Sequence, residues 1–286
     1  MQETGFTFEK LDNKGVETLV EWAAAEGWNP GINDASLFYN TDKDGFYGYF
    51  RNGKLVGGGS IVNYNNEYGF MGFFIVRPEY RNMGIGAKLW RIRRDTLRQR
   101  LLPGAAIGMD GVSAMLPFYA RGGFVKDFAD ERYMFLGSEV AYSSQVSAIL
   151  PGDMEMIHGY DTACFGFERR KFIADWVFQS EAGAFKYIDN LKLKGYGVIR
   201  KARIGYKIGP LFADNPDVAE ELFRCCLKFG AGQNVFLDIT LSNLHAVLLT
   251  RKYSGTFMFE CGRMYNGTAP ILPKHKIFGI TSFELG

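Results

Sequence analysis

The sequence has few of the residues that build metal sites or disulfide frameworks. Among 286 residues there are only four cysteines and three histidines, and none of them shows the spacing of metal ligands. Cys225 and Cys226 are adjacent within a helical pattern, which favours reduced, buried thiols over disulfides. We therefore expect no metal site. The remaining cysteines are Cys164 and Cys261, and the three histidines are His158, His245 and His275.

The sequence also lacks a strong net charge and a long apolar run. Its formal charge is +2, so no global field favours nucleic acid or an anionic membrane as a partner. The amino terminus is polar and acidic, unlike a signal peptide, and no apolar run reaches the roughly 18 residues of a membrane span. We expect a cytoplasmic protein with no membrane partner. Arginines crowd residues 91–100, but a solvated helix face is a commoner explanation than a nucleic-acid site.

The length of the chain and its 47% hydrophobic content are sufficient for two domains with filled cores. Residues 138–153 are rich in small and polar residues, which is typical of a linker. The predicted division is a first domain over residues 1–137, this linker, and a second domain over residues 154–286.

A strand, a glycine-rich turn and an amphipathic helix follow one another over residues 70–90. A proline stops the apolar run, and Gly84 and Gly86 let the backbone approach a ligand without a Cβ in the way. The first amides of a helix have no helical partner and its dipole is positive at that end. With Arg81 beside them, these amides predict a site for an anion, most simply a pyrophosphate.

The spacing of this turn decides between phosphate-binding motifs. A dinucleotide motif requires a third glycine where Leu89 stands, and a P-loop requires Gly-Lys before Ser or Thr, whereas Gly86 precedes Ala87. The pattern Arg81-x-x-Gly84-x-Gly86-Ala87, directly after a strand, instead resembles the acetyl-CoA signature of the GNAT acetyltransferase superfamily.

This resemblance implies acetyl-CoA as the cosubstrate. The thioester carbonyl would meet backbone amides at the end of the strand, which in the superfamily splays away from its neighbour, and the diphosphate would meet the turn. The residues implied in cofactor binding are Phe74, Ile75, Val76, Arg81, Asn82, Met83, Gly84, Ile85, Gly86 and Ala87.

A second motif lies at the end of the first domain. Tyr119-x-x-x-Gly123-Phe124 is similar to the end of the GNAT core, where the phenol protonates the departing coenzyme A thiolate. The resemblance therefore implies that Tyr119 is the general acid. From the residues alone, a tyrosine packed at a helix end is the alternative.

Residues 26–31, Glu-Gly-Trp-Asn-Pro-Gly, form an irregular loop after the first helical pattern. In the superfamily the corresponding region shapes the acceptor pocket. The resemblance implies Glu26, Trp28 and Asn29 as acceptor-binding residues, and ordinary loop residues are the alternative.

The general base is the least defined part of the predicted site. Many relatives carry a glutamate on the central strand where this sequence has Phe70, which cannot accept a proton. Asp110, at the end of the next strand, and Glu67, before the central strand, are the candidate bases. Glu26 and a water relay are further alternatives, and a helix cap and a surface carboxylate are the structural explanations for the two candidates.

The second half repeats the order of elements of the first. Residues 205–213 correspond to the strand 68–76, and the helix after Asn243 corresponds to the helix with Tyr119. Between strand and helix, however, residues 214–217 read Asp-Asn-Pro-Asp, and their carboxylates would repel a pyrophosphate. We therefore predict one cofactor site per chain. An intact first copy with a divergent second copy resembles one tandem subgroup of the GNAT superfamily.

The fold class implied is α/β (α+β), with two tandem GNAT-like domains, each a mixed, mainly antiparallel sheet flanked by helices. The expected function is acetyl-CoA-dependent transfer of an acetyl group to a primary amine, of a small molecule or a peptide, by direct attack without an acyl-enzyme. The alternative is a non-catalytic protein that binds or senses acyl-CoA, which the missing glutamate at Phe70 favours. We expect the second domain to support the acceptor site or to form a homodimer.

Overall fold

The computed structural model describes residues 5–286, which fold into two repeats of one order of elements. The first repeat consists of β1 (Phe6–Lys10), α1 (Asn13–Ala25), α2 (Asp34–Thr41), β2 (Phe46–Arg51), β3 (Lys54–Tyr64), β4 (Tyr68–Val76), α3 (Ile85–Gln99), β5 (Ala106–Val112), α4 (Leu116–Arg121) and β6 (Val125–Leu136). The second consists of β7 (Val146–Ala148), α5 (Met154–Phe165), α6 (Arg170–Val177), β8 (Ala182–Asp189), β9 (Lys192–Lys201), β10 (Tyr206–Ala213), α7 (Pro216–Phe229), β11 (Asn234–Thr240), α8 (Leu244–Lys252) and β12 (Thr256–Asn266), followed by β13 (Ile277–Gly279). The predicted internal duplication is confirmed. Within residues 5–286, no helix has both the length and the apolar character that crossing a membrane requires.

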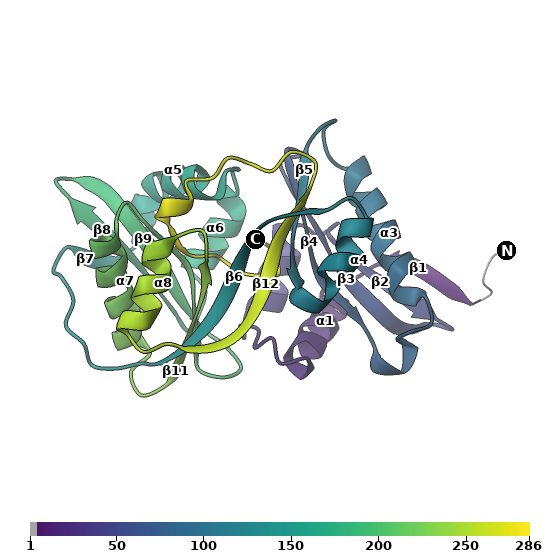
Figure 1. The fold of residues 1–286 in the computed structure, drawn as a ribbon, viewed down its shortest axis with the longest axis horizontal. Coiled ribbons are helices and arrows are strands. Elements are labelled where there is room, and N and C mark those ends of the chain that lie inside the picture. Colours follow the sequence, from purple (N-terminus) through teal and green to yellow (C-terminus); the bar gives the residue numbers. More distant parts are fainter. Residues whose placement is uncertain (1–4) are drawn as a thin grey trace.

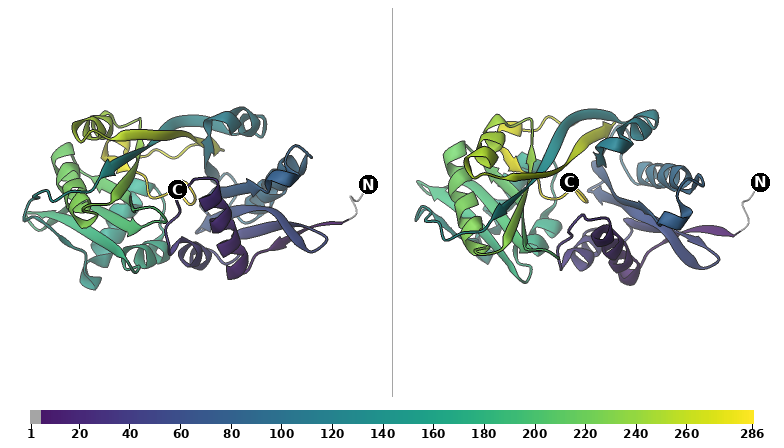
Figure 2. Two further views of the ribbon diagram at one scale, coloured as in Figure 1. Left: turned by 90° about the horizontal axis from the view of Figure 1, so that it is seen from below. Right: turned by 60° about the horizontal axis from the view of Figure 1, so that its bottom comes forward.

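The strands of the described chain form one mixed, mainly antiparallel sheet with helices on both sides (Figures 1 and 2). Its order is β1-β2-β3-β4-β5-β12-β6-β11-β10-β9-β8-β7, and β13 pairs with β10 beside this path. The neighbours β4 and β5 are parallel, as are β10 and β11. Parallel neighbours need a crossover connection, which α3 and α7 provide in the two repeats. The predicted fold class is therefore confirmed.

The last strand of each repeat lies in the other half of the molecule. β5 pairs with β12, with Arg263 opposite Asp110, whereas β6 pairs with β11, with Arg132 opposite Asp238. β6 and β12 also pair with each other and cross the middle of the molecule together (Figure 1). The sheet is thus continuous across the boundary predicted at residues 137–154, and β7 lies within the predicted linker. The division into two folding units stays a prediction.

Consecutive glycines in β3 let helices approach both faces of the sheet. A Cβ at Gly58 would lie 2.7 Å from Leu19 of α1, and a Cβ at Gly59 would lie 2.3 Å from the guanidinium carbon of Arg93 on α3. Because successive strand residues face opposite sides, α1 and α3 cover opposite faces. The consecutive glycines therefore serve close packing of helices on both faces of the sheet.

A shared apolar core joins the two halves. One cluster of buried side chains includes Phe38 of α2, Phe73 of β4 and Trp176 of α6, and extends to Leu285. The rings of Phe38 and Trp176 stack across the junction with their centroids 6.0 Å apart. Loss of packing in one half should therefore lower the stability of the other half as well.

We expect the two halves to unfold together, because they share the sheet and this core. Leu237 of β11 is fully buried, so Leu237→Ala should cost roughly 2–5 kcal/mol of unfolding free energy. Urea unfolding followed by far-ultraviolet circular dichroism and by tryptophan fluorescence should give coincident curves that shift together. Leu244→Ala, at a position that is 65% exposed, is the control and should leave the midpoint nearly unchanged. Two separate transitions would contradict a shared core.

Candidate active site

The site is built where two parallel strands part. β4 pairs with β5 only along Tyr68–Phe70, opposite Ala106–Gly108. Gly108 permits this close pairing, because a Cβ there would lie 1.9 Å from the hydroxyl of Tyr68. Beyond this point β5 continues along β12 while β4 leaves it. A gap opens beside Met71–Val76, in the place where the family resemblance implies a splayed strand.

A bulge in β4 turns its backbone toward this gap. Phe73 has a φ of 48°, a left-handed conformation that is strained for a bulky residue. At the same place the register with β3 shifts, from Ser60 opposite Gly72 to Gly58 opposite Ile75. A bulge breaks the regular alternation of side chains. As a result, every residue from Met71 to Val76 borders the gap.

A cavity of about 480 Å³ fills the gap between β4 and β5. Residues of both repeats and of the final segment of the chain line it. It collects most of the site residues predicted from the sequence. Those that line it are Glu26, Trp28, Phe74, Ile75, Val76, Arg81, Asn82, Gly86, Ala87, Asp110 and Tyr119.

The start of α3 presents backbone donors at the end of this cavity. Gly84 precedes the helix with a φ of 76°, and the first helical bond runs from Lys88 N to Gly84 O, 3.2 Å. The amides of Ile85, Gly86 and Ala87 therefore have no helical acceptor. This arrangement can bind an anion, as the glycine turn predicts.

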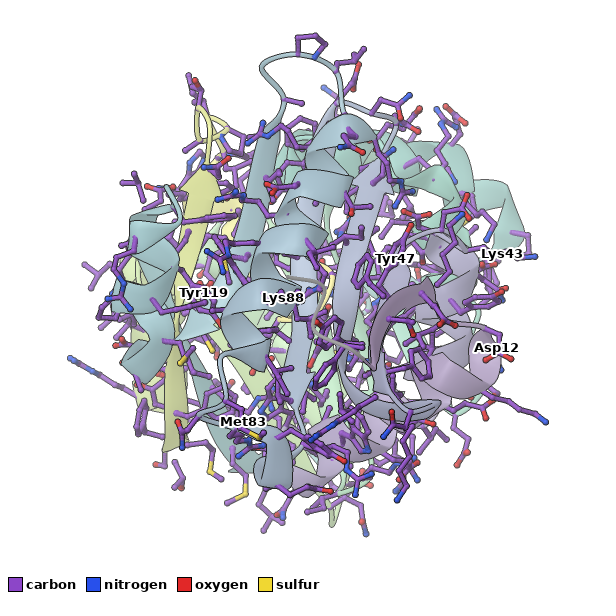
Figure 3. The ribbon with its side chains drawn as sticks, turned by 90° about the vertical axis from the view of Figure 1, so that its right-hand side faces the viewer. Asp12, Lys43, Tyr47, Met83, Lys88 and Tyr119 are labelled. Carbon is purple, nitrogen blue, oxygen red and sulfur yellow. The ribbon has the colours of Figure 1, made fainter. Side chains whose placement is uncertain are left out.

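The remaining residues of the turn surround these donors. Asn82 lines the cavity and has a φ of 61°. The side chain of Ile85, the first residue of α3, is buried. Met83 is 55% exposed at the tip of the turn, and Figure 3 shows Met83 and Lys88 near the start of α3, on the side that faces the viewer. A Cβ at Gly86 would have only ordinary contacts, at 3.6 Å or more, so the glycine keeps this wall open.

Arg81 lies across the mouth of the cavity. Its Nε donates to the carbonyl oxygen of Val76 at 2.8 Å, and its guanidinium forms an ion pair with Glu26. The predicted anion-binding residue and a predicted acceptor-binding residue are therefore direct neighbours. Both side chains are partly exposed, so a ligand can reach them.

Tyr119 of α4 places its phenol in the cavity wall, in a side chain that is 5% exposed. Its ring lies edge-on to Phe74, with centroids 6.4 Å apart, and it packs over Gly111, where a Cβ would lie 2.8 Å from the ring. Figure 3 shows Tyr119 beside the first turns of α3. Burial raises the pKa of Tyr119 to about 12. The phenol is therefore protonated at neutral pH and can donate a proton.

A buried arginine supports this wall from behind. Arg93 of α3 is fully buried and donates to the carbonyl oxygens of Ser60 and of Gly72, the latter at 2.6 Å. Desolvation lowers the pKa of Arg93 to about 9. Its positive charge opposes the effect of burial on the pKa of Tyr119, which makes the phenol a stronger acid than burial alone would.

The acceptor loop reaches the cavity with only part of its predicted residues. Glu26 and Trp28 line it, and the carbonyl oxygen of Trp28 accepts a bond from Arg132 at 2.8 Å. Asn29 does not line it. The Asn29 amide instead donates to Ile204 O at 3.0 Å and accepts from Ile204 N at 2.8 Å. Asn29 therefore ties this loop to the second repeat, and we do not retain it as an acceptor contact.

The two candidate bases, Asp110 and Glu67, lie at different distances from the cavity. Asp110 lines the cavity, but both of its oxygens accept from Arg263, at 2.6 and 2.9 Å. Glu67 lies in the exposed turn before β4, at the opposite end of the strand from the cavity. The structure does not bring Glu67 to the site. Phe70 is fully buried, so the position where many relatives carry a glutamate offers no proton acceptor.

Some cavity residues come from segments that the sequence analysis did not connect with the site: Arg132, Phe259, Cys261, Phe283 and Glu284. They reach it because β6 and β12 cross between the halves and because the final segment runs along β4. No local motif marks them. Two arginines of the arginine-rich segment 91–100 bind groups within the protein. Arg98 donates to Ala105 O at 2.8 Å, and Arg100 binds Asp42 at 2.7 Å.

The corresponding place in the second repeat is closed. β10 and β11 pair along Tyr206–Ile208, and the last pair is Ile208 opposite Leu237. Beyond that point β13 occupies the space beside β10. At the start of α7 the side chain of Asn215 caps the helix by accepting from Val218 N at 3.0 Å, and Pro216 has no N–H to offer. We find no counterpart of the glycine turn in this repeat.

Comparison with known sequence families assigns both repeats. The pattern of the acetyltransferase (GNAT) family matches residues 14–124, and that of an acetyltransferase (GNAT) domain matches residues 156–279. The holothin acyltransferase of Pseudoalteromonas sp. (strain SANK 73390) is 32% identical over 273 residues, which cover 93% of this chain and 90% of that protein. An uncharacterized N-acetyltransferase of Bacillus subtilis (strain 168), YitH, is 22% identical over 84% of this chain and 83% of its own.

Solved structures show the same fold. A proposed acetyltransferase from Pyrococcus horikoshii has a TM-score of 0.85 at 22% identity and covers 100% of this chain and 98% of its own. A tandem GNAT protein from the clavulanic acid biosynthesis pathway has a TM-score of 0.63 at 12% identity, over 93% of this chain and 99% of its own. At these identities the likeness concerns the fold alone.

The buried carboxyl of Asp130, beside the cavity, should make the stability of the protein depend on pH. Asp130 of β6 stands opposite the cavity residue Cys261 and is fully buried. Desolvation, and then the charge of Asp110, raise the pKa of Asp130 well above its usual range. The folded state therefore retains a proton that the unfolded state loses near pH 4. Stability contributed by this site falls as pH rises above that value.

We expect Asp130→Asn to stabilise the protein, and more so at about pH 8 than at about pH 4, because the amide has no charge to desolvate. The gain should be roughly 1–3 kcal/mol at the higher pH. Thermal melts across this range test it, with the partly exposed Asp175→Asn as the control. A gain that is independent of pH would contradict the assignment.

Proposed function

Because the chain belongs to the GNAT acetyltransferase family, as a tandem member and an acyltransferase, we propose that it transfers an acetyl group from acetyl-CoA to a primary amine. The observation that carries this proposal is one cavity bordered by the parted end of β4, the start of α3 and Tyr119. These are the parts that bind a thioester, bind a diphosphate and donate a proton.

The residues around the cavity fit acetyl-CoA. Its diphosphate would accept from the amides of Ile85, Gly86 and Ala87, with Arg81 beside them, because these donors have no helical partner. The open wall at Gly86 would leave room for the pantetheine arm. The bulged backbone between Phe73 and Ile75 would direct donors to the thioester carbonyl.

Direct attack needs a neutral amine, a polarised carbonyl and a proton for the leaving sulfur. The nitrogen would form a bond to the carbonyl carbon, and the carbon–sulfur bond would break. The Tyr119 phenol, protonated at neutral pH and edge-on to Phe74, would give its proton to the sulfur.

The acceptor we propose is a small molecule. Trp28, Phe259 and Phe283 are among the residues that line a cavity of about 480 Å³, a volume that leaves little room for a protein segment beside acetyl-CoA. The relative named holothin acyltransferase resembles nearly the whole chain, including the second repeat. Its name gives holothin as the compound that it acylates, and we propose a holothin-like acceptor as the first compound to test here.

Tyr119→Phe tests the proposed chemistry. The ring packing over Gly111 stays the same, but the proton donor is lost, so kcat for acetyl transfer should fall roughly 100-fold. The KM for acetyl-CoA should change little, because the cofactor contacts lie elsewhere. Release of free thiol from acetyl-CoA, measured with a panel of small amines, gives both constants.

Tyr142→Phe removes a hydroxyl from a tyrosine that is 38% exposed and outside the cavity, and it should have wild-type rates. An unchanged kcat in Tyr119→Phe would remove Tyr119 from the mechanism. Absence of transfer to every amine by the wild-type protein would overturn the proposed function itself.

A further inference from the structure

The carboxylates that line the cavity differ in how their charge is balanced. Glu26 pairs with Arg81 at the mouth, and Asp110 gives both oxygens to Arg263. Glu284 belongs to the final segment and is 2% exposed, and its Oε2 is buried without a hydrogen-bond partner. It is therefore the cavity carboxylate, within the part of the chain that the structure describes, for which no guanidinium partner is found.

The final segment holds Glu284 firmly in this place. Residues 277–286 are all buried. The hydroxyl of Tyr64 donates to Leu285 O at 2.8 Å, and Leu285 N donates to the side chain of Ser282 at 3.0 Å. The backbone of Glu284 lies so close to β4 that a Cβ at Gly72 would be 1.9 Å from its carbonyl oxygen. A residue held this tightly can serve as a fixed catalytic group.

The path of this segment explains why the second repeat has no open cleft. β13 pairs with β10 where the first repeat has its cavity, and Ile280 N then donates to Asp238 O at 2.9 Å. A Cβ at Gly209 would lie 2.4 Å from Thr281 O, so the segment packs directly against β10. The final segment thus passes through the position of the cleft in the second repeat and places Glu284 at the cavity of the first repeat.

Charged groups on three strands lie within electrostatic range of the Glu284 carboxylate. Arg132 of β6 and Lys207 of β10 are the cations, and Asp110 of β5 is the anion. Asp238 is occupied by Arg132 at 2.6 and 2.7 Å, and Lys207 is buried with its Nζ unpartnered.

We propose that Glu284 is the general base of the acyl transfer, an inference that rests on the proposed function. The Glu284 carboxylate takes a proton from the acceptor ammonium. The freed nitrogen lone pair forms the bond to the thioester carbon, the carbon–sulfur electron pair leaves on sulfur, and the Tyr119 phenol protonates that sulfur. The nitrogen, now bonded to the acetyl carbon, loses its second proton through solvent to the Tyr119 phenolate, and Glu284 releases its proton to water.

Glu284→Gln tests this role with two amines of different basicity and acetyl-CoA as donor. Phenethylamine is protonated at neutral pH and needs a base, whereas p-anisidine is already neutral. With phenethylamine, kcat should fall roughly 100-fold at neutral pH and recover as the pH rises and the amine loses its own proton. With p-anisidine the loss should be much smaller. The KM for acetyl-CoA should stay the same in both cases.

Glu139→Gln makes the same chemical change at an exposed position outside the cavity and should behave as the wild type. Glu284→Asp keeps the carboxylate and should retain the pH profile at a reduced rate, which serves if the glutamine variant folds poorly in a thermal melt. A kcat within about twofold of wild type, or an equal loss with both amines at every pH, would overturn the role of Glu284. These outcomes leave the proposed function standing if the wild type is active and Tyr119→Phe is not.

Discussion

The parting of β4 from β5 is the constraint on which the site depends. Gly108 fixes the last paired position, because only a residue without a side chain fits under the hydroxyl of Tyr68. The strained Phe73 then turns β4 away, and the fold keeps that strain only because β3, α3 and the final segment pack against it. The result is a gap in the middle of a sheet that would otherwise be closed by hydrogen bonds.

The two repeats have divided the use of this geometry between them. Both contain parallel strands that pair for three residues and then separate, but only the first leaves the gap open and follows it with a glycine turn. In the second, β13 fills the gap and Asn215 closes the helix. Exchange of β6 and β12 places residues of both repeats around one cavity. The duplicated fold thus serves a single site.

Local sequence signals predicted the parts of the site that short segments build. The glycine turn and the Tyr119 motif are each set by a few adjacent residues, so their patterns can be recognised in the sequence. The strand exchange is not readable in this way, because Asp130 lies opposite Cys261 and Arg263 binds Asp110 across strands that are far apart in the sequence. Glu284 could not be found for the same reason, since the position of a final segment depends on long-range packing. Glu67 is a candidate because it lies near the central strand, and Asn29 because the family resemblance implies its loop, but neither lines the cavity.

The most direct test of this account is a crystal structure of the protein with coenzyme A and an acetylated amine. The account predicts one coenzyme A per chain, with its diphosphate at the amides of Ile85–Ala87, its sulfur beside the Tyr119 hydroxyl between β4 and β5, and the nitrogen of the product facing the carboxylate of Glu284. Coenzyme A at the start of α7, or a product nitrogen turned away from Glu284 toward the mouth at Glu26, would contradict it.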